Sequence, residues 1–94
     1  MKLWGKVYRD HRISDQYILQ LSRERIPSGD DWAEALTQIC KQLDLERPVM
    51  LPKHERELRN FGLTAFRRDD FMETVSFDRF TVEVIPEDKK KTDR

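Results

Sequence analysis

His54 opens a run of charged residues that ends at Glu57, and it is one of two histidines in this sequence whose side chains could act in catalysis or bind a metal. A zinc-binding helix needs two histidines four residues apart, so that both reach one metal ion from the same face. Position 58 is a leucine, and the other histidine, His11, falls in a predicted turn. The sequence therefore predicts no metal site. It leaves two interpretations of His54: a half-buried residue on the inner face of a short helix, or a general base that acts with a carboxylate.

Four carboxylates stand close together further along the chain: Asp69, Asp70, Glu73 and Asp78. An EF-hand loop places its oxygen ligands at alternate positions around a central glycine, which this spacing does not reproduce. Capping of a helical turn and exposure to solvent explain these side chains without a metal ion. The sequence contains no glycine-rich phosphate loop either, so it predicts no cofactor and no catalytic set.

A basic group, Lys53, Arg56, Arg59, Arg67 and Arg68, is the remaining candidate for function. The whole chain carries 18 basic and 18 acidic residues, which excludes a protein that is uniformly basic for nucleic-acid binding. The charges are nevertheless segregated, with segment 47–68 basic and segment 69–88 acidic. Phe66 beside two arginines is a combination found in proteins that bind single strands. Either this group forms a solvated face, or it contacts an anion, a nucleic acid or a partner protein.

Periodicity predicts the elements that must position these residues. Alternation along residues 3–8 and again along 13–21, with an aspartate-containing turn between them, predicts an N-terminal β-hairpin. Apolar residues at helical spacing from Trp32 to Leu43 predict the main amphipathic helix. Cys40 lies on that apolar stripe and is the only cysteine, so we expect a buried thiol and no intrachain disulfide.

The second half of the chain is predicted to contain several short strands and helical segments. The apolar segment 48–51, bounded by prolines, predicts a brief strand, and a short helix follows from Pro52 to the glycine at position 62. Residues 63–68 are expected to be extended, 70–74 to form a helical turn, and 77–85 to form the last strand. The predicted fold is α+β, in the order β-β-α-β-(short α)-β, with the main helix packed on a small, mostly antiparallel sheet. Residues 1–86 form one domain, and 87–94 a mobile charged tail.

The motif KLWGK at residues 2–6, together with DDF at 69–71 and SFD at 76–78, resembles a group of small bacterial proteins of unknown function. The likeness covers most of the chain. It implies a bacterial origin and brings no activity, cofactor or catalytic residue with it.

These observations favour function classes without selecting a ligand. The N-terminal residues do not form a signal peptide, and no run of about 18 apolar residues would cross a membrane, so we expect a cytoplasmic protein without membrane attachment. The leading hypothesis is a non-enzymatic protein-interaction module, acting alone or as a homodimer. The alternatives are a weak nucleic-acid or phosphate binder that uses segment 47–68, and an enzyme that uses His54 with a carboxylate.

Overall fold

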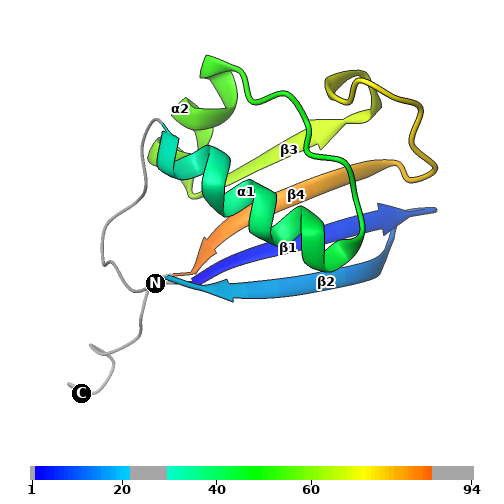
Figure 1. Ribbon diagram of the computed structural model, residues 1–94, viewed down its shortest axis with the longest axis horizontal. Coiled ribbons are helices and arrows are strands. Elements are labelled where there is room, and N and C mark those ends of the chain that lie inside the picture. Colours follow the sequence, from blue (N-terminus) through cyan, green and yellow to red (C-terminus); the bar gives the residue numbers. More distant parts are fainter. Residues whose placement is uncertain (1, 22–29, 86–94) are drawn as a thin grey trace.

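The computed structural model describes residues 2–21 and 30–85 of the chain. Within them, four strands form one antiparallel sheet in the order β2-β1-β4-β3, and two helices cover it (Figure 1). The elements are β1 (Lys2–Arg9), β2 (Arg12–Gln20), α1 (Asp30–Leu43), α2 (Pro52–Phe61), β3 (Leu63–Arg67), a 3-10 turn (Arg68–Asp70) and β4 (Arg79–Ile85). The predicted α+β class is confirmed. The tail predicted at 87–94 lies outside the described residues.

The predicted N-terminal hairpin is confirmed, and the structure defines its turn. Asp10 and His11 have φ angles of 55° and 65°, the positive values that a two-residue hairpin turn of type I′ requires at both central positions. The backbone N–H of Asp10 donates a hydrogen bond of 2.8 Å to the carboxylate of Asp78, next to β4. This bond ties the hairpin turn to the other end of the sequence. The register of β1 and β2 shifts between Val7 and Tyr8, which leaves Ser14 as a bulge.

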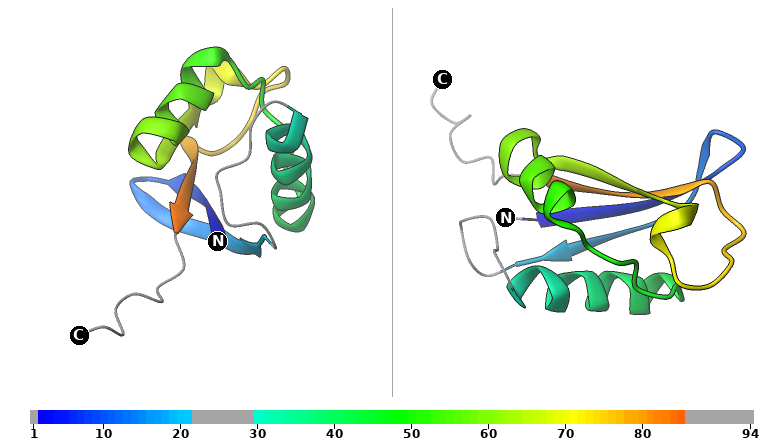
Figure 2. Two further views of the ribbon diagram at one scale, coloured as in Figure 1. Left: turned by 90° about the vertical axis from the view of Figure 1, so that its left-hand side faces the viewer. Right: turned by 90° about the horizontal axis from the view of Figure 1, so that it is seen from above.

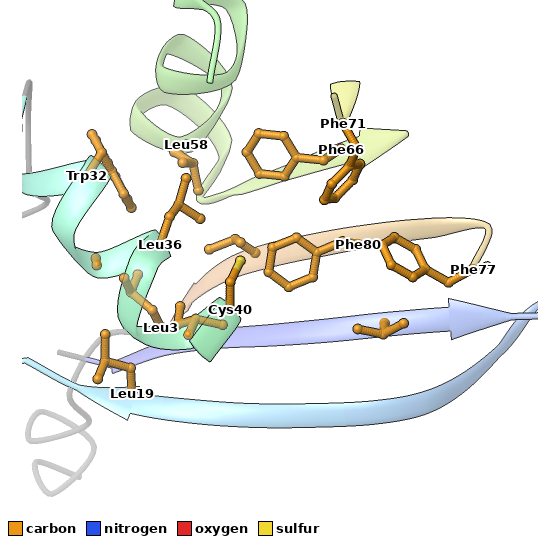
Figure 3. Packing of buried hydrophobic residues seen from close by; sticks show 14 residues of the cluster. Leu3, Leu19, Trp32, Leu36, Cys40, Leu58, Phe66, Phe71, Phe77 and Phe80 are labelled. Atoms are coloured by element: carbon orange, nitrogen blue, oxygen red, sulfur yellow. The ribbon is translucent and has the colours of Figure 1, made fainter. Parts of the chain in front are cut away.

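The main helix, predicted from the apolar stripe, is confirmed as α1. Trp32, Leu36, Ile39 and Cys40 are buried beneath it, where they meet side chains of the sheet (Figure 3). The helix ends at Leu43, after which Asp44 adopts a positive φ of 60° and the N–H of Leu45 donates to the carbonyl of Cys40. This reversal directs the chain back across the helix-covered side of the molecule.

One element of the predicted order differs: the brief strand expected at 48–51 is not formed. Pro48 and Pro52 lack the N–H that a strand uses for pairing, and the Val49 N–H donates instead to the carbonyl of Asp70. The short helix follows as predicted, from Pro52 to Phe61, and Gly62 ends it in the left-handed conformation with a φ of 73°. The third strand is Leu63–Arg67, within the segment expected to be extended. The turn expected at 70–74 occurs slightly earlier, at Arg68–Asp70.

Both helices lie on one side of the curved sheet, α1 over its β2 half and α2 beside β3 (Figure 2). The core between them holds large side chains from every element, including Leu3, Leu58, Phe66 and Phe80 (Figure 3). The other side of the sheet, the open face, faces away from both helices. The register assigns to it Lys2, Trp4, Lys6 and Tyr8 of β1, Ile13, Gln16, Ile18 and Gln20 of β2, Leu63, Ala65 and Arg67 of β3, and Arg79, Thr81, Glu83 and Ile85 of β4.

The helix-covered face includes one position that must remain without a side chain. Gly5 lies on the central strand β1, directly beneath α1. A Cβ atom there would lie 2.6 Å from Cγ2 of Ile39 and 3.2 Å from Cε1 of Phe80. Real Cβ atoms do not approach other carbons to 2.6 Å, so the absence of a side chain at Gly5 sets how closely α1 packs on the sheet.

We therefore expect Gly5→Ala to lower the free energy of unfolding by about 1–3 kcal/mol, because the added methyl group overpacks the core. Urea unfolding followed by circular dichroism measures this loss. In an Ile39→Ala background the clashing Cγ2 is gone, so the same change at Gly5 should cost much less. Equal losses in the two backgrounds would contradict the proposed contact.

Candidate functional site

His54 lies on the inner side of α2, as the sequence predicts, and it is completely buried. Its Nδ1 accepts a hydrogen bond of 3.0 Å from the backbone N–H of Leu51, the residue that precedes the helix. Its ring packs on Phe66 with 4.4 Å between centroids, and its Nε2 lies 3.6 Å from the carboxylate of Asp70. His54 therefore anchors the start of α2 to β3 and to the 3-10 turn.

Burial also determines the protonation state of the His54 imidazole. Removal from water lowers the pKa of the imidazole, and this effect exceeds the opposing attraction of the Asp70 carboxylate, which raises it. The ring is thus held neutral, with Nδ1 as acceptor and the proton on Nε2 toward Asp70. A carboxylate is adjacent, as a general-base role requires, but the ring has no surface that a substrate can reach.

A pocket that could admit a small molecule lies away from His54, between α1 and the segment that follows it. It has a volume of about 420 Å³ and is lined by Leu36 of α1, by Val49 and Met50 of the following segment, and by Met72. His54 does not line it. Arg47 at its rim donates to Thr37 and to a helix carbonyl, so its one cation is already engaged. Its described lining mixes apolar side chains with the charged Arg47 and Glu55 and includes no histidine or cysteine.

The acidic group is used within the fold. The carboxylate of Asp70 accepts the backbone N–H of Arg67 at 2.9 Å and so caps the 3-10 turn. Asp78 accepts the N–H of Asp10 and pairs with Arg68 at 3.3 Å. Across residues 2–21 and 30–85, no three His, Cys, Asp or Glu side chains converge as metal ligands would. The predicted capping role is therefore confirmed for Asp70, at a turn slightly earlier than expected.

Cys40 is buried among the core residues of α1, as predicted. Burial raises the pKa of its thiol to about 11, against a smaller opposing effect of Arg47. A thiol that stays protonated at neutral pH is a poor nucleophile. Cys40 is thus a packing residue.

The five basic candidates do not form one surface. Lys53, Arg56 and Arg59 are exposed on α2, and Arg59 pairs with Glu55 one turn earlier. Arg68 donates to the carbonyl of Phe77 at 2.9 Å and pairs with Asp78, which holds two loops together. Arg67 alternates with the buried Phe66 along β3, so it is the one candidate that reaches the open face.

On the open face, Arg67 lies directly opposite Arg79 of β4. The guanidinium of Arg79 lies over the ring of Tyr8, 4.0 Å from the ring centroid. Among the described residues, neither arginine forms an ion pair with a carboxylate. Two like charges on adjacent strands repel each other, so this end of the open face has an unbalanced positive charge.

The other end of the open face is balanced. Lys6 lies over the ring of Trp4 at 4.1 Å and pairs with Glu83 at 3.1 Å, while the Trp4 indole N–H donates to Gln16 at 2.9 Å. At this end Ile18 and Leu63 remain 49% and 45% exposed, and Ile13, opposite Tyr8 at the arginine end, is 42% exposed. The open face therefore combines aromatic rings, exposed aliphatic side chains and two unpaired arginines.

Periodicity alone identified only part of this site. The alternating runs along β1 and β4 placed Trp4 with Tyr8, and separately showed which residues of β4 share a side. They gave no indication that β4 lies between β1 and β3. That strand order brings Tyr8, Arg79 and Arg67 into one row, so the site depends on pairing between strands remote in sequence.

Comparison with protein-family models, curated proteins and solved structures gives no significant match. The resemblance to small bacterial proteins therefore stays an expectation. None of the helices in the described part of the chain has the length and apolar character needed to cross a membrane. The open face, with its aromatic rings and arginines, is therefore the candidate functional site.

The burial of neutral His54 predicts a stability that falls in acid. Below the unfolded-state pKa of about 6.5, the unfolded chain binds a proton that the folded chain resists, so the free energy of unfolding should decrease from about pH 7 to about pH 5. His54→Gln, which keeps an acceptor but does not titrate, should flatten this decrease in urea titrations. Gln38→Asn, a non-titrating change at an exposed residue of α1, should retain the wild-type slope. An unchanged slope in His54→Gln would show that His54 is not the group responsible.

Proposed function

We propose that this protein is a non-enzymatic interaction module, whose open face binds an acidic segment of a partner protein. The observation that carries the proposal is the pair of arginines, Arg67 and Arg79, which lie side by side and form no ion pair with a carboxylate of the described residues. A guanidinium is planar and presents parallel N–H donors that match a carboxylate in a bidentate contact. Binding an acidic side chain between the two arginines would remove their mutual repulsion as well as form new hydrogen bonds.

The rest of the open face supports a polypeptide partner. Ile13 supplies exposed aliphatic surface in the row of the arginine pair, and Ile18 and Leu63 supply it at the other end of the face. Interfaces between proteins combine aromatic and arginine anchors with such apolar surface. Charge complementarity favours a partner that is acidic on this surface.

A single-stranded nucleic acid is the second candidate, and one observation favours it. Cations lie over both aromatic rings of β1, Lys6 over Trp4 and Arg79 over Tyr8. Proteins that bind single strands combine stacking rings with cations that follow the phosphates. The formal net charge of the whole chain is zero, which gives little long-range attraction for a polyanion, so we place this candidate second.

The setting proposed for this module is the cytoplasm of a bacterium. The sequence motifs at residues 2–6 and 69–78 support the bacterial origin. The single buried Cys40 supports a compartment in which disulfides play no part in folding.

Titrating the isotope-labelled protein with poly-L-glutamate tests the proposal. Amide and indole NMR signals should shift for Trp4, Tyr8 and Arg79, and the signals of α2 should remain in place. The double variant Arg67→Glu/Arg79→Glu should weaken this binding by at least about tenfold, because carboxylates then face carboxylates. A matched control, Arg56→Glu/Arg59→Glu on α2, makes the same change of charge away from the open face and should bind as the wild type does.

Shifts confined to α2, or equal losses in the two double variants, would contradict a site on the open face. Oligothymidylate in a parallel titration separates the two candidates. If it shifts the same signals at concentrations where poly-L-glutamate has no effect, the nucleic-acid function replaces the proposed one.

A further inference from the structure

The edge strand β2 carries a second interaction surface. It is outermost in the sheet (Figure 1). It is nine residues long, and most of its side chains are exposed. An edge strand presents unpaired N–H and C=O groups to any chain that can pair with them, and natural proteins usually block such edges with proline, lysine or a short strand. β2 contains no proline and no lysine, and its bulge at Ser14 affects only the end near the turn.

The opposite edge of the sheet is far less suited to pairing. β3 has only five residues. Helix α2 packs beside β3. Arg67, the last residue of β3, would place a cation next to any strand that paired there. β2 is therefore the edge strand better suited to pairing with another chain.

We propose that two copies of this chain associate by antiparallel pairing of β2 with β2, which joins their sheets into one continuous sheet of eight strands. The inference rests on β2 alone and is independent of what the open face binds. A two-fold axis perpendicular to the sheet pairs only residues that lie on the same face, so a residue at the centre pairs with itself.

Charge selects the register. Centring the pair on Asp15 would place two carboxylates opposite each other, which is unfavourable. Centring it on Gln16 pairs Asp15 with Tyr17 and, beyond the bulge at Ser14, Ile13 with Ile18, so no like charges meet and two exposed aliphatic side chains lie together. Moving the centre to Tyr17 would place Ile13 opposite Gln20 and leave Arg12 without a partner in β2. The register centred on Gln16 is therefore the one we assign.

Pairing through β2 also enlarges the open face. Four strands about 4.8 Å apart and about 24 Å long offer roughly 450 Å² on one face. A standard protein interface uses about 800 Å² from each partner. Joining two sheets through β2 doubles the continuous face to about 900 Å². The exposed Ile18 of both copies then lies near the seam between the two sheets, on the open face.

Paired charge variants at Gln16 test this proposal by analytical ultracentrifugation. Wild type should show a concentration-dependent dimer. Gln16→Lys and Gln16→Glu should each dissociate at least about tenfold more readily, because identical charges then meet at the two-fold axis. An equimolar mixture of the two variants should recover the dimer, since lysine then faces glutamate. Gln38→Lys, an exposed change on α1, should dimerise as the wild type does.

Disulfide trapping provides an independent measurement of the register. In a Cys40→Ala background, Gln16→Cys should form a cross-linked dimer on mild oxidation, because residues directly opposite in a sheet lie within disulfide range. Arg56→Cys in the same background should not.

A wild type that remains monomeric at high concentration would overturn the pairing, as would a dimer that neither Gln16 variant weakens. A monomer whose open face still binds poly-L-glutamate would leave the proposed function intact, so the two claims fail separately.

Discussion

The close approach of α1 to the sheet at Gly5 is the contact on which the rest of this structure depends. Ile39 fits against the bare backbone of the central strand β1, beside the ring of Phe80. Because α1 lies so close, its stripe of Trp32, Leu36 and Cys40 is removed from water together with the inner residues of every strand. Burial of apolar surface is the dominant favourable contribution to folding, and a chain of this length has only one core in which to obtain it.

This arrangement has a direct consequence for the other side of the sheet. With the large side chains on the helix side, the open face carries the charged and aromatic residues that remain. Much of its charge is neutralised locally, as Lys6 is by Glu83. Arg67 and Arg79 are the exception. A pair of adjacent, unneutralised arginines reduces stability slightly in the isolated protein, and such a cost is common where a surface serves to bind something else.

The sequence predicted those parts of the fold and of the open face that depend on residues close together in the chain. It did not predict the parts that depend on contacts between remote segments. The stripe from Trp32 to Leu43 and the hairpin alternation are local patterns, and both elements form where they are predicted. The apolar segment at 48–51 has the composition of a strand, but its flanking prolines and its position beside the 3-10 turn prevent strand pairing, and Val49 instead donates to the carbonyl of Asp70. The complete burial of His54 and the row formed by Tyr8, Arg79 and Arg67 arise from contacts between remote segments, which periodicity does not encode.

The central claim is that one face of this sheet is packed and the other is open, and solvent paramagnetic relaxation of methyl groups measures it most directly. A soluble paramagnetic probe should broaden the methyl signals of Ile13 and Leu63 on the open face at low concentration. The signals of Leu36 and Ile39, buried beneath α1, should stay sharp. Equal protection of the two sets of methyl groups, or broadening of Ile39 before Leu63, would contradict the account.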